Sequence, residues 1–258
     1  MTSGPGAPRL TVVIPAYREG SRLRDTVRHV NEVCASAIGD HEIIVVLDGP
    51  ETPAEAVVTP DQRQGRDVRV LVNDRNRGKG FSVRRGMLEA RGDYVLFTDA
   101  DLSIPIESVG AFVAALDAGA DVAIGSRLAA DALEQGTRDL GRHTMSRAFN
   151  TLVRWTMLRD VTDSQCGFKA FRREVARRLF SLQRVDRFAF DVEILWLAQR
   201  WGYHVVEVPV VCVYHSQSSV RRVFDSVSML RDLARVRLDA LRGRYDEART
   251  DTARGRGL

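Results

Sequence analysis

The sequence predicts an α/β protein with an open, mostly parallel β-sheet flanked by helices. Three observations support this prediction. Short runs rich in valine and isoleucine alternate with segments of helical periodicity through the first half of the chain, as in repeated βαβ units. These runs are mostly apolar on both faces, which is typical of strands that helices cover on both sides. Polar residues directly follow several of them, at the edge where open α/β sheets bind ligands.

The first half of the chain supplies most of the expected sheet. Its strand-like runs cover residues 9–16, 41–49, 68–73, 93–100 and 121–127. Between them, residues 21–37 and 106–118 carry apolar side chains every three or four positions, which predicts helices with one buried face. Another helix is expected directly after the glycine-containing stretch 76–80.

The second half has a different pattern. It contains a basic helical stretch over about 139–158, a strand-like "CGFKAFR", a helix starting near Asp191, a strand pair around "YHVVEVPVVCVYH" and a long final helix that is amphipathic. No repeat or low-complexity linker divides the chain. We therefore expect one domain over residues 9–245, with a disordered N-terminus at 1–8 and a disordered tail at 246–258, which have little to bury.

The composition narrows the functional class. Lysine and arginine exceed aspartate and glutamate by 38 to 34, and the surplus suits phosphate-bearing ligands but is too small to indicate nucleic acid. Three irregularly spaced cysteines indicate neither a disulfide framework nor a zinc site. We find no signal peptide and no run long enough to span a membrane. These features predict a cytoplasmic protein whose membrane contact, if any, is peripheral.

Two carboxylates stand one residue apart at the end of a buried strand in "YVLFTDADLSIP". Asp99 and Asp101 repel each other unless a positive partner lies between them. Their oxygen atoms suit a hard cation such as Mg²⁺ or Mn²⁺, which binds one or two carboxylates together with substrate phosphates. The alternative is that both carboxylates cap the loop, because the motif is short and common.

Two further motifs indicate a nucleotide site. Asp48 ends the second strand in "LDGP", where an acidic side chain can accept hydrogen bonds from a base or ribose, or can simply cap the loop. In "NRGKG", Gly78 and Gly80 bracket Lys79 just before a helix. The glycines would allow a ligand close to the backbone and Lys79 could bind phosphate, although the spacing matches neither the dinucleotide fingerprint nor the Walker loop.

Taken in order and at these distances, the motifs resemble a known family. "VVIPAYRE", "VLDGP", "NRGKG", "DADLS", "GSR", "DSQCGFKAF" and "FAFDVEIL" are similar to the inverting glycosyltransferases of family 2, which have the GT-A fold. The resemblance is strongest to the dolichyl-phosphate (polyprenyl-phosphate) β-glucosyltransferase branch and spans roughly residues 9–240. The ordered set is far more specific than any single motif.

The resemblance implies a UDP-sugar donor, with glucose as the expected sugar, and a Mg²⁺ or Mn²⁺ ion. It places the nucleotide against Pro15, Ala16, Tyr17 and Glu19, with Asp48 at the uracil. It places Lys79 beside the donor, Asp99 at the ribose and diphosphate, and Asp101 on the metal, with Arg127 near the sugar or phosphates. His215, just past a strand end, is a further candidate for the metal or diphosphate shell.

The acceptor implied by the resemblance is a polyprenyl phosphate, with a soluble small-molecule hydroxyl as the alternative. Asp163, Gln165 and Lys169 lie where the family meets the donor sugar and acceptor. A hydroxyl acceptor needs a base, for which Asp191 is the candidate, although Asp191 and Glu193 could equally cap a helix. A phosphate acceptor needs positive charge, for which the candidates are Arg142, His143, Arg147, Arg221 and Arg222, and Ser219 is a further acceptor-binding candidate.

Residues 220–242 predict a helix with two interpretations. Apolar residues recur at helical spacing at Val223, Val227, Leu230, Ala234, Leu238 and Leu241. This stripe, with arginines around it, could lie on an anionic bilayer as a peripheral membrane contact, or it could pack on the protein's own core.

Two other functional classes remain: a sugar-phosphate nucleotidyltransferase, which would release pyrophosphate, and a non-catalytic binder of nucleotide sugars.

Overall fold

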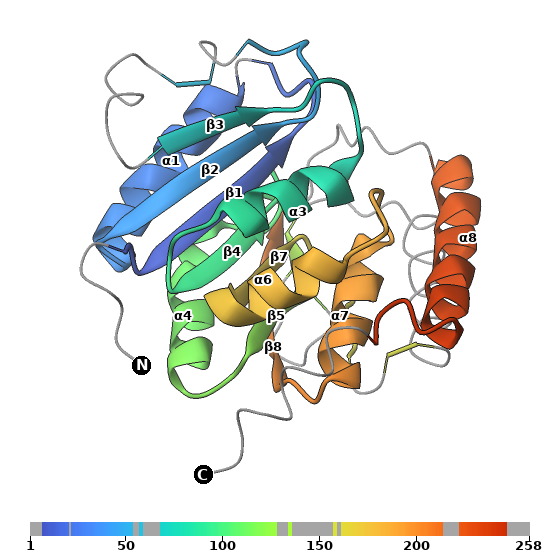
Figure 1. The fold of residues 1–258 in the computed structure, drawn as a ribbon. Coiled ribbons are helices and arrows are strands. Elements are labelled where there is room, and N and C mark those ends of the chain that lie inside the picture. Colours follow the sequence, from blue (N-terminus) through green and yellow to red (C-terminus); the bar gives the residue numbers. More distant parts are fainter. Residues whose placement is uncertain are drawn as a thin grey trace.

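The computed structural model describes residues 7–20, 22–53, 57–58, 68–127, 134–135, 157–158, 161–213 and 222–246, with the backbone alone at 134–135 and 222–227. Its centre is a seven-stranded sheet in the order β3-β2-β1-β4-β7-β5-β8 (Figure 1). The strands are β1 (Leu10–Ala16), β2 (His41–Leu47), β3 (Val68–Val72), β4 (Tyr94–Thr98), β5 (Val122–Ser126), β7 (Phe168–Arg172) and β8 (Val205–Pro209).

The pairing is parallel except at one strand. β1 lies between β2 and β4, with Leu10 opposite both His41 and Tyr94. β7 runs antiparallel between β4 and β5, while β8 is parallel to β5. The five strands expected from the first half of the chain are confirmed, each within about two residues. An open, mostly parallel sheet is therefore the observed architecture.

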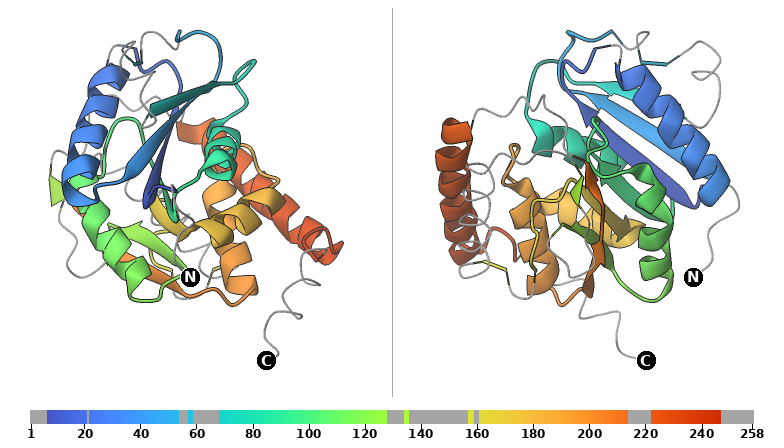
Figure 2. Two further views of the ribbon diagram at one scale, coloured as in Figure 1. Left: turned by 60° about the vertical axis from the view of Figure 1, so that its left-hand side comes forward. Right: turned by 180° about the vertical axis from the view of Figure 1, so that it is seen from behind.

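Helices cover both faces of the sheet (Figures 1 and 2). One face carries α1 (Arg22–Ala37), the 3₁₀ turn η2 (Ile106–Ser108) and α4 (Val109–Asp117). The other face carries α3 (Lys79–Glu89), α6 (Arg173–Leu182), α7 (Phe190–Arg200) and α8 (Arg222–Leu241), with α8 outermost. Strand alternation divides the core: Val13 packs with the α3 side, and Val12 and Ile14 pack with the α1 side.

The order of the strands indicates where a ligand would bind. The chain leaves β1 through α1 to β2 on one side, whereas β4 pairs with β1 on the other side. Ligands in open α/β sheets bind at such a switch point, beyond the carboxyl ends of the two strands. The loops that begin there include residues 17–20 after β1 and residues 99–105 after β4. Both loops contain site residues expected from the sequence.

The second half departs from the sequence expectation in two places. The predicted strand pair is split, because β8 belongs to the main sheet whereas β9 (Cys212–Val213) pairs with β6 (Glu134–Gln135) in a separate two-stranded sheet. Helix α6 was not predicted, although its buried residues Val175, Ala176, Leu179 and Phe180 have helical spacing. The predicted helix over 139–158 and the predicted disordered ends lie almost entirely outside the described residues.

The final helix is confirmed, but its packing is not the one that the apolar stripe suggested. α8 contacts the core through Met229, Leu233 and Val236, which are buried. Leu230, Leu238 and Leu241 of the expected stripe are exposed instead. The interpretation that this stripe packs on the protein's own core is therefore wrong. Among the described residues, no helix is long and apolar enough to cross a membrane.

Candidate active site

The loop after β4 is held in a specific conformation at the switch point. Leu102 has a positive φ of 48°, which is unusual for a leucine and often marks a functional loop. Thr26 on α1 donates a hydrogen bond of 2.9 Å to the carbonyl of Ala100. Asp101 Oδ1 accepts a bond of 3.0 Å from the backbone N–H of Ser103. Among the described residues, no hydrogen bond to the second carboxylate oxygen of Asp101 is seen, so this oxygen could bind a ligand.

Lys79 is the positive partner of Asp99. It is the first residue of α3, and its Nζ lies 2.5 Å from Asp99 Oδ1. Burial alone would lower the pKa of Lys79, but the carboxylates of Asp99, Asp191 and Asp101 together raise it above its ordinary value. Lys79 is therefore charged at neutral pH and partly relieves the repulsion between the two aspartates.

Glu19 brings a third carboxylate to the same place from the loop after β1. Burial, followed by the negative charge of Asp101 and a smaller contribution from Asp99, raises the pKa of Glu19, although Arg22 acts in the opposite direction. The residue before it, Arg18, has a positive φ of 58°. The loops after β1 and β4 therefore converge their acidic side chains on one region.

These carboxylates fit a hard divalent cation that is shared with a diphosphate. Within the described residues, no three His, Cys, Asp or Glu side chains are gathered closely enough to hold a metal by themselves. Mg²⁺ and Mn²⁺ suit carboxylate oxygens, and Mg²⁺ commonly takes only one or two of them, with substrate phosphates and water completing its shell. Asp99 and Asp101 match that donor set. Their role as metal ligands stays a prediction, and the chemistry of the two side chains fits it.

Asp48 organises the loop that leads to Lys79. It is buried, and it accepts hydrogen bonds of 2.8 Å from the backbone N–H groups of Arg77 and Gly78. Asn73 donates a further bond of 2.9 Å to Asp48 Oδ1. Capping of this loop, one of the two roles considered for Asp48, is thus present in the structure. A contact to uracil stays a prediction.

The two glycines beside Lys79 serve packing within the protein. An added Cβ at Gly80 would lie 2.7 Å from the carbonyl oxygen of Val185 and 2.8 Å from that of Arg187. A Cβ at Gly78 would collide with the carbonyl of Asp186, whose oxygen accepts a bond of 3.0 Å from Phe81 N. The close approach that these glycines allow in the structure is to the segment 185–187, and a ligand beside this loop stays a prediction.

Asp191 lies in the first turn of α7, but it does not cap the helix. Its Oδ1 lies 2.6 Å from Lys169 Nζ, and both side chains are buried. Lys169 also donates to the carbonyl of Cys166 at 2.5 Å. Burial raises the pKa of Asp191, while Lys169 and Lys79 act in the opposite direction and Asp99 adds to the increase. The pair Lys169–Asp191 thus adjoins the pair Lys79–Asp99.

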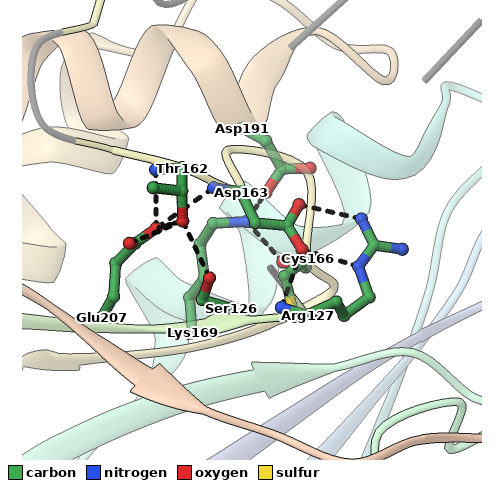
Figure 3. A network of polar contacts seen from close by, with 8 residues as sticks. All are labelled: Ser126, Arg127, Thr162, Asp163, Cys166, Lys169, Asp191 and Glu207. Carbon is green, nitrogen blue, oxygen red and sulfur yellow. Dashed lines mark hydrogen bonds and ion pairs between the residues drawn. The ribbon is translucent and has the colours of Figure 1, made fainter. Parts of the chain in front are cut away.

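A second ion pair joins the part-buried Arg127, directly after β5, to the buried Asp163 in the segment before β7 (Figure 3). Arg127 binds Asp163 through Nε at 2.6 Å and Nη2 at 2.8 Å. Burial would raise the pKa of Asp163, but its bonds with Arg127 lower it below the ordinary value. The pKa of Arg127 is raised by Asp163 despite the opposing effect of burial. This bidentate geometry fixes the guanidinium plane.

The other expected residues divide into two groups. Pro15 and Ala16 end β1 and are buried, Tyr17 is exposed, and Gln165 Nε2 contacts the sulfur of Met229 on α8 at 3.9 Å. The second group lies outside the described residues and comprises Arg142, His143, Arg147, His215, Ser219 and Arg221. Arg222 begins α8, but its side chain is also outside the description.

Sequence reasoning missed the residues that support this site. Glu207 on β8 accepts bonds of 2.8 and 3.1 Å from the backbone N–H groups of Thr162 and Asp163, and Ser126 bonds the hydroxyl of Thr162 at 2.9 Å (Figure 3). Glu193, which the sequence suggested only as a helix cap, instead accepts bonds from the N–H groups of Arg184 and Val185. The available signal was a charged residue inside an apolar strand or helix, which must find buried partners.

Comparison with known proteins agrees with this geometry. Residues 11–180 match the pattern of glycosyl transferase family 2. A dolichyl-phosphate beta-glucosyltransferase of Dictyostelium discoideum is 33% identical over 248 residues, which cover 91% of this chain and 75% of that protein. The protein of the same name from Drosophila melanogaster is 35% identical over 237 residues, covering 87% of this chain and 73% of the relative.

Solved structures show the same fold. Glucosyl-3-phosphoglycerate synthase of Mycobacterium tuberculosis, in complex with Mn²⁺, UDP and phosphoglyceric acid, aligns with a TM-score of 0.64 at 20% identity, over 90% of this chain and 78% of that one. A mannosyltransferase of Pyrobaculum calidifontis, in complex with GDP-Man and Mn²⁺, aligns with a TM-score of 0.56 at 20% identity, over 93% and 66%. Sequence, fold and site geometry agree: this chain belongs to glycosyl transferase family 2.

Proposed function

We propose that this protein transfers glucose from UDP-glucose to a polyprenyl phosphate of the dolichyl type, with inversion at the anomeric carbon, at the cytoplasmic membrane face. The observation that carries the donor half is the convergence of Glu19, Asp99 and Asp101 with Lys79 at the switch point. The acceptor half draws on the relatives named dolichyl-phosphate beta-glucosyltransferase, which cover most of this chain.

The chemistry requires positive charge where the diphosphate leaves. An oxygen of the acceptor phosphate attacks C1 of glucose, the bond from C1 to the diphosphate oxygen breaks, and UDP departs with the electron pair. Asp101 and Asp99 would hold a divalent cation, which would supply positive charge against the departing diphosphate. Lys79, fixed beside Asp99, and Arg127, held flat by Asp163, supply further positive charge near the donor.

The pairing of Asp191 favours the phosphate acceptor. A general base must be able to take a proton from the nucleophile, whereas Asp191 is held by Lys169 at 2.6 Å in a buried pair. A phosphate acceptor is already an anion and needs no base. We propose that Lys169 and Asp191 instead position the neighbouring Lys79. A soluble hydroxyl acceptor, with Asp191 as its base, is the alternative that the experiment below separates.

The test is UDP release from UDP-glucose in the presence of Mg²⁺ or Mn²⁺, with a short polyprenyl phosphate or the matching free polyprenol as acceptor. We expect turnover with the phosphate only, with the glucose recovered on the lipid. Turnover with the polyprenol or with a soluble hydroxyl would overturn the acceptor assignment. Pyrophosphate release from a nucleoside triphosphate and sugar phosphate would instead indicate a nucleotidyltransferase.

The metal site has its own variant. We expect Asp101→Asn to lower metal-dependent transfer by a factor of about 10² or more, because the cation loses its carboxylate ligand. The matched control is Asp117→Asn, which removes an exposed carboxylate that bonds Arg9 and Tyr94 and should leave transfer unchanged. Circular dichroism checks that both variants fold. Full activity in Asp101→Asn would contradict the assignment of Asp101 to the metal site.

A further inference from the structure

Helix α8 is attached to the protein by one face. Met229, Leu233 and Val236 are buried and belong to the same core cluster as α7, and their spacing of four and three residues follows one side of a helix. Asp239 lies on this inner side, is buried, and accepts a bond of 2.9 Å from Arg244. The packing that holds α8 in place is therefore already complete without its other face.

The other face carries a second apolar stripe, which consists of Leu230, Ala234, Leu238 and Leu241 and which we call the outer stripe. Its leucines are exposed by 44%, 51% and 85% in that order, and Ala234 is exposed as well. The spacing of four, four and three residues places all of them on one side of the helix. The three leucines are half of the six large hydrophobic side chains that are exposed among the described residues.

Positive charge borders the outer stripe on both sides. At 100° per residue, the exposed Arg231, Arg235 and Arg242 lie along one edge of the stripe and the exposed Arg237 lies along the other. The acidic residues of this part of the helix are turned inward. Asp239 is buried against Arg244, and Asp232 is half-buried, with its charge facing Arg187, Arg235 and Arg231.

The position of α8 leaves this face accessible to a large partner. α8 lies beyond α7 at the margin of the molecule, on the side away from β3 (Figures 1 and 2). The segment that adjoins it, between α6 and α7, adds Arg187 near Asp232 and the exposed Phe188. An apolar stripe with arginines along both edges matches a partner surface that has an apolar interior and anionic groups at its boundary.

We propose that the outer stripe of α8 lies on an anionic lipid bilayer, with its leucines in the boundary between headgroups and acyl chains and its arginines at the lipid phosphates. A peptide-binding groove would need a concave site, whereas this face is one convex helix, and a second copy of the chain would place arginine rows against each other. The inference goes beyond the proposed reaction and is argued from α8 alone, so the failure of either leaves the other standing.

The test is flotation of the full chain with vesicles of neutral phosphatidylcholine or of phosphatidylcholine mixed with phosphatidylglycerol. We expect binding to the anionic vesicles only, weakened by salt. The variant Leu230→Ser/Leu238→Ser/Leu241→Ser should lose at least about tenfold in vesicle affinity. The variant Arg231→Glu/Arg235→Glu should lose about 25-fold or more in vesicle affinity, at roughly fivefold for each arginine.

Matched controls separate the outer stripe from general surface effects. Val72→Ser removes an exposed apolar side chain at the end of the edge strand β3, and Arg91→Glu/Arg177→Glu reverses two exposed arginines elsewhere. Both should bind vesicles as the unchanged chain does. Equal vesicle binding by the α8 variants would overturn the proposal, and so would a dimer in size-exclusion chromatography that the leucine variant converts to a monomer.

A second readout separates the membrane contact from the reaction. On a short, water-soluble polyprenyl phosphate, the α8 variants should turn over at the unchanged rate, whereas on a long-chain acceptor in vesicles their rate should fall about as much as their vesicle affinity. If the unchanged chain binds vesicles but transfers no sugar, the proposed function fails and the membrane contact holds. Loss of turnover on the soluble acceptor would place α8 in the reaction itself and overturn the inference.

Discussion

Removing Arg127 from its ion pair with Asp163 should lower the stability of the protein strongly. Asp163 is fully buried, and three of its contacts come from Arg127, including the backbone N–H at 3.1 Å. We expect Arg127→Met to lower the free energy of unfolding by roughly 3–5 kcal/mol, because it leaves a buried charge without its partner. The control Arg9→Met breaks an exposed ion pair with Asp117 and should cost less than about 1 kcal/mol.

The cost of Arg127→Met should depend on pH. In the unchanged chain, burial would raise the pKa of Asp163, but the bonds from Arg127 outweigh it and lower that pKa. The stability that the ionised carboxylate contributes is therefore fully present above the pKa of the unfolded state. It is lost only as the pH falls through the lower pKa of the folded state. In the variant, the guanidinium no longer opposes burial, and only the backbone N–H of residue 127 and the charge of Lys169 still do, so the pKa of Asp163 should rise. The loss in free energy of unfolding caused by Arg127→Met should therefore be large near pH 7 and should shrink toward about pH 4. Urea unfolding at both values measures this, and a constant deficit would contradict it.

At the scale of elements, the contact between the start of α3 and the segment 185–187 sets the position of Lys79. Gly80→Ala would place a Cβ against three backbone atoms, all within 2.9 Å. We expect it to destabilise the fold by about 1–3 kcal/mol, because backbone cannot move aside as a flexible side chain does. We expect Gly110→Ala in α4 to stabilise the fold instead. A Cβ there would meet nothing within 4 Å, and the higher helix propensity of alanine contributes up to about 1 kcal/mol.

The two glycine variants form a matched pair, since both add one methyl group to a helical glycine. Urea midpoints compare their stability, and UDP-glucose affinity reports whether a shifted α3 carries Lys79 away from Asp99. We expect weaker donor binding in Gly80→Ala and unchanged binding in Gly110→Ala. The same sign of stability change in both variants would show that the 185–187 contact does not constrain α3.

The elements that the sequence predicted well are those whose signal is local. The strands of the first half follow from apolar runs, and the switch-point loops follow from the polar residues at their ends. Gly80 shows the opposite case: its spacing suggested a ligand loop, but its partner is a backbone segment about a hundred residues away, and no local pattern reveals it. In α8, two apolar stripes both have helical spacing, so periodicity alone cannot tell which one packs.

At the scale of the whole molecule, one sheet separates two core clusters, with Val13 on one side and Ile14 on the other. Since the same strands form the boundary of both clusters, loss of either side exposes the other. We therefore propose that residues 9–245 unfold as one cooperative unit, in line with the single domain predicted from the sequence. Coincident urea transitions by tryptophan fluorescence and circular dichroism would support it, and two separated transitions would contradict it.

The C-terminal boundary of that unit can be located by truncation. Tyr245 is buried, its ring centroid lies 5.6 Å from that of Trp196, and its hydroxyl donates a bond of 2.6 Å to buried Glu193. Glu193 also holds the N–H of Val185, so Tyr245 secures the segment against which α3 packs. We expect a chain that stops at residue 246 to match the full chain in stability within about 0.5 kcal/mol.

A chain that stops at residue 242 removes Tyr245 and should lose roughly 3–5 kcal/mol, as the loss of a large buried aromatic does. The single change Tyr245→Phe isolates the hydroxyl and should cost about 1–3 kcal/mol, because it takes a hydrogen-bond partner from the buried carboxyl group of Glu193. Tyr94→Phe is the control, since its bond to Asp117 is exposed. Equal stability of the two truncated chains would place the end of the folded unit before Tyr245 and would remove the link from the C-terminus to the donor site.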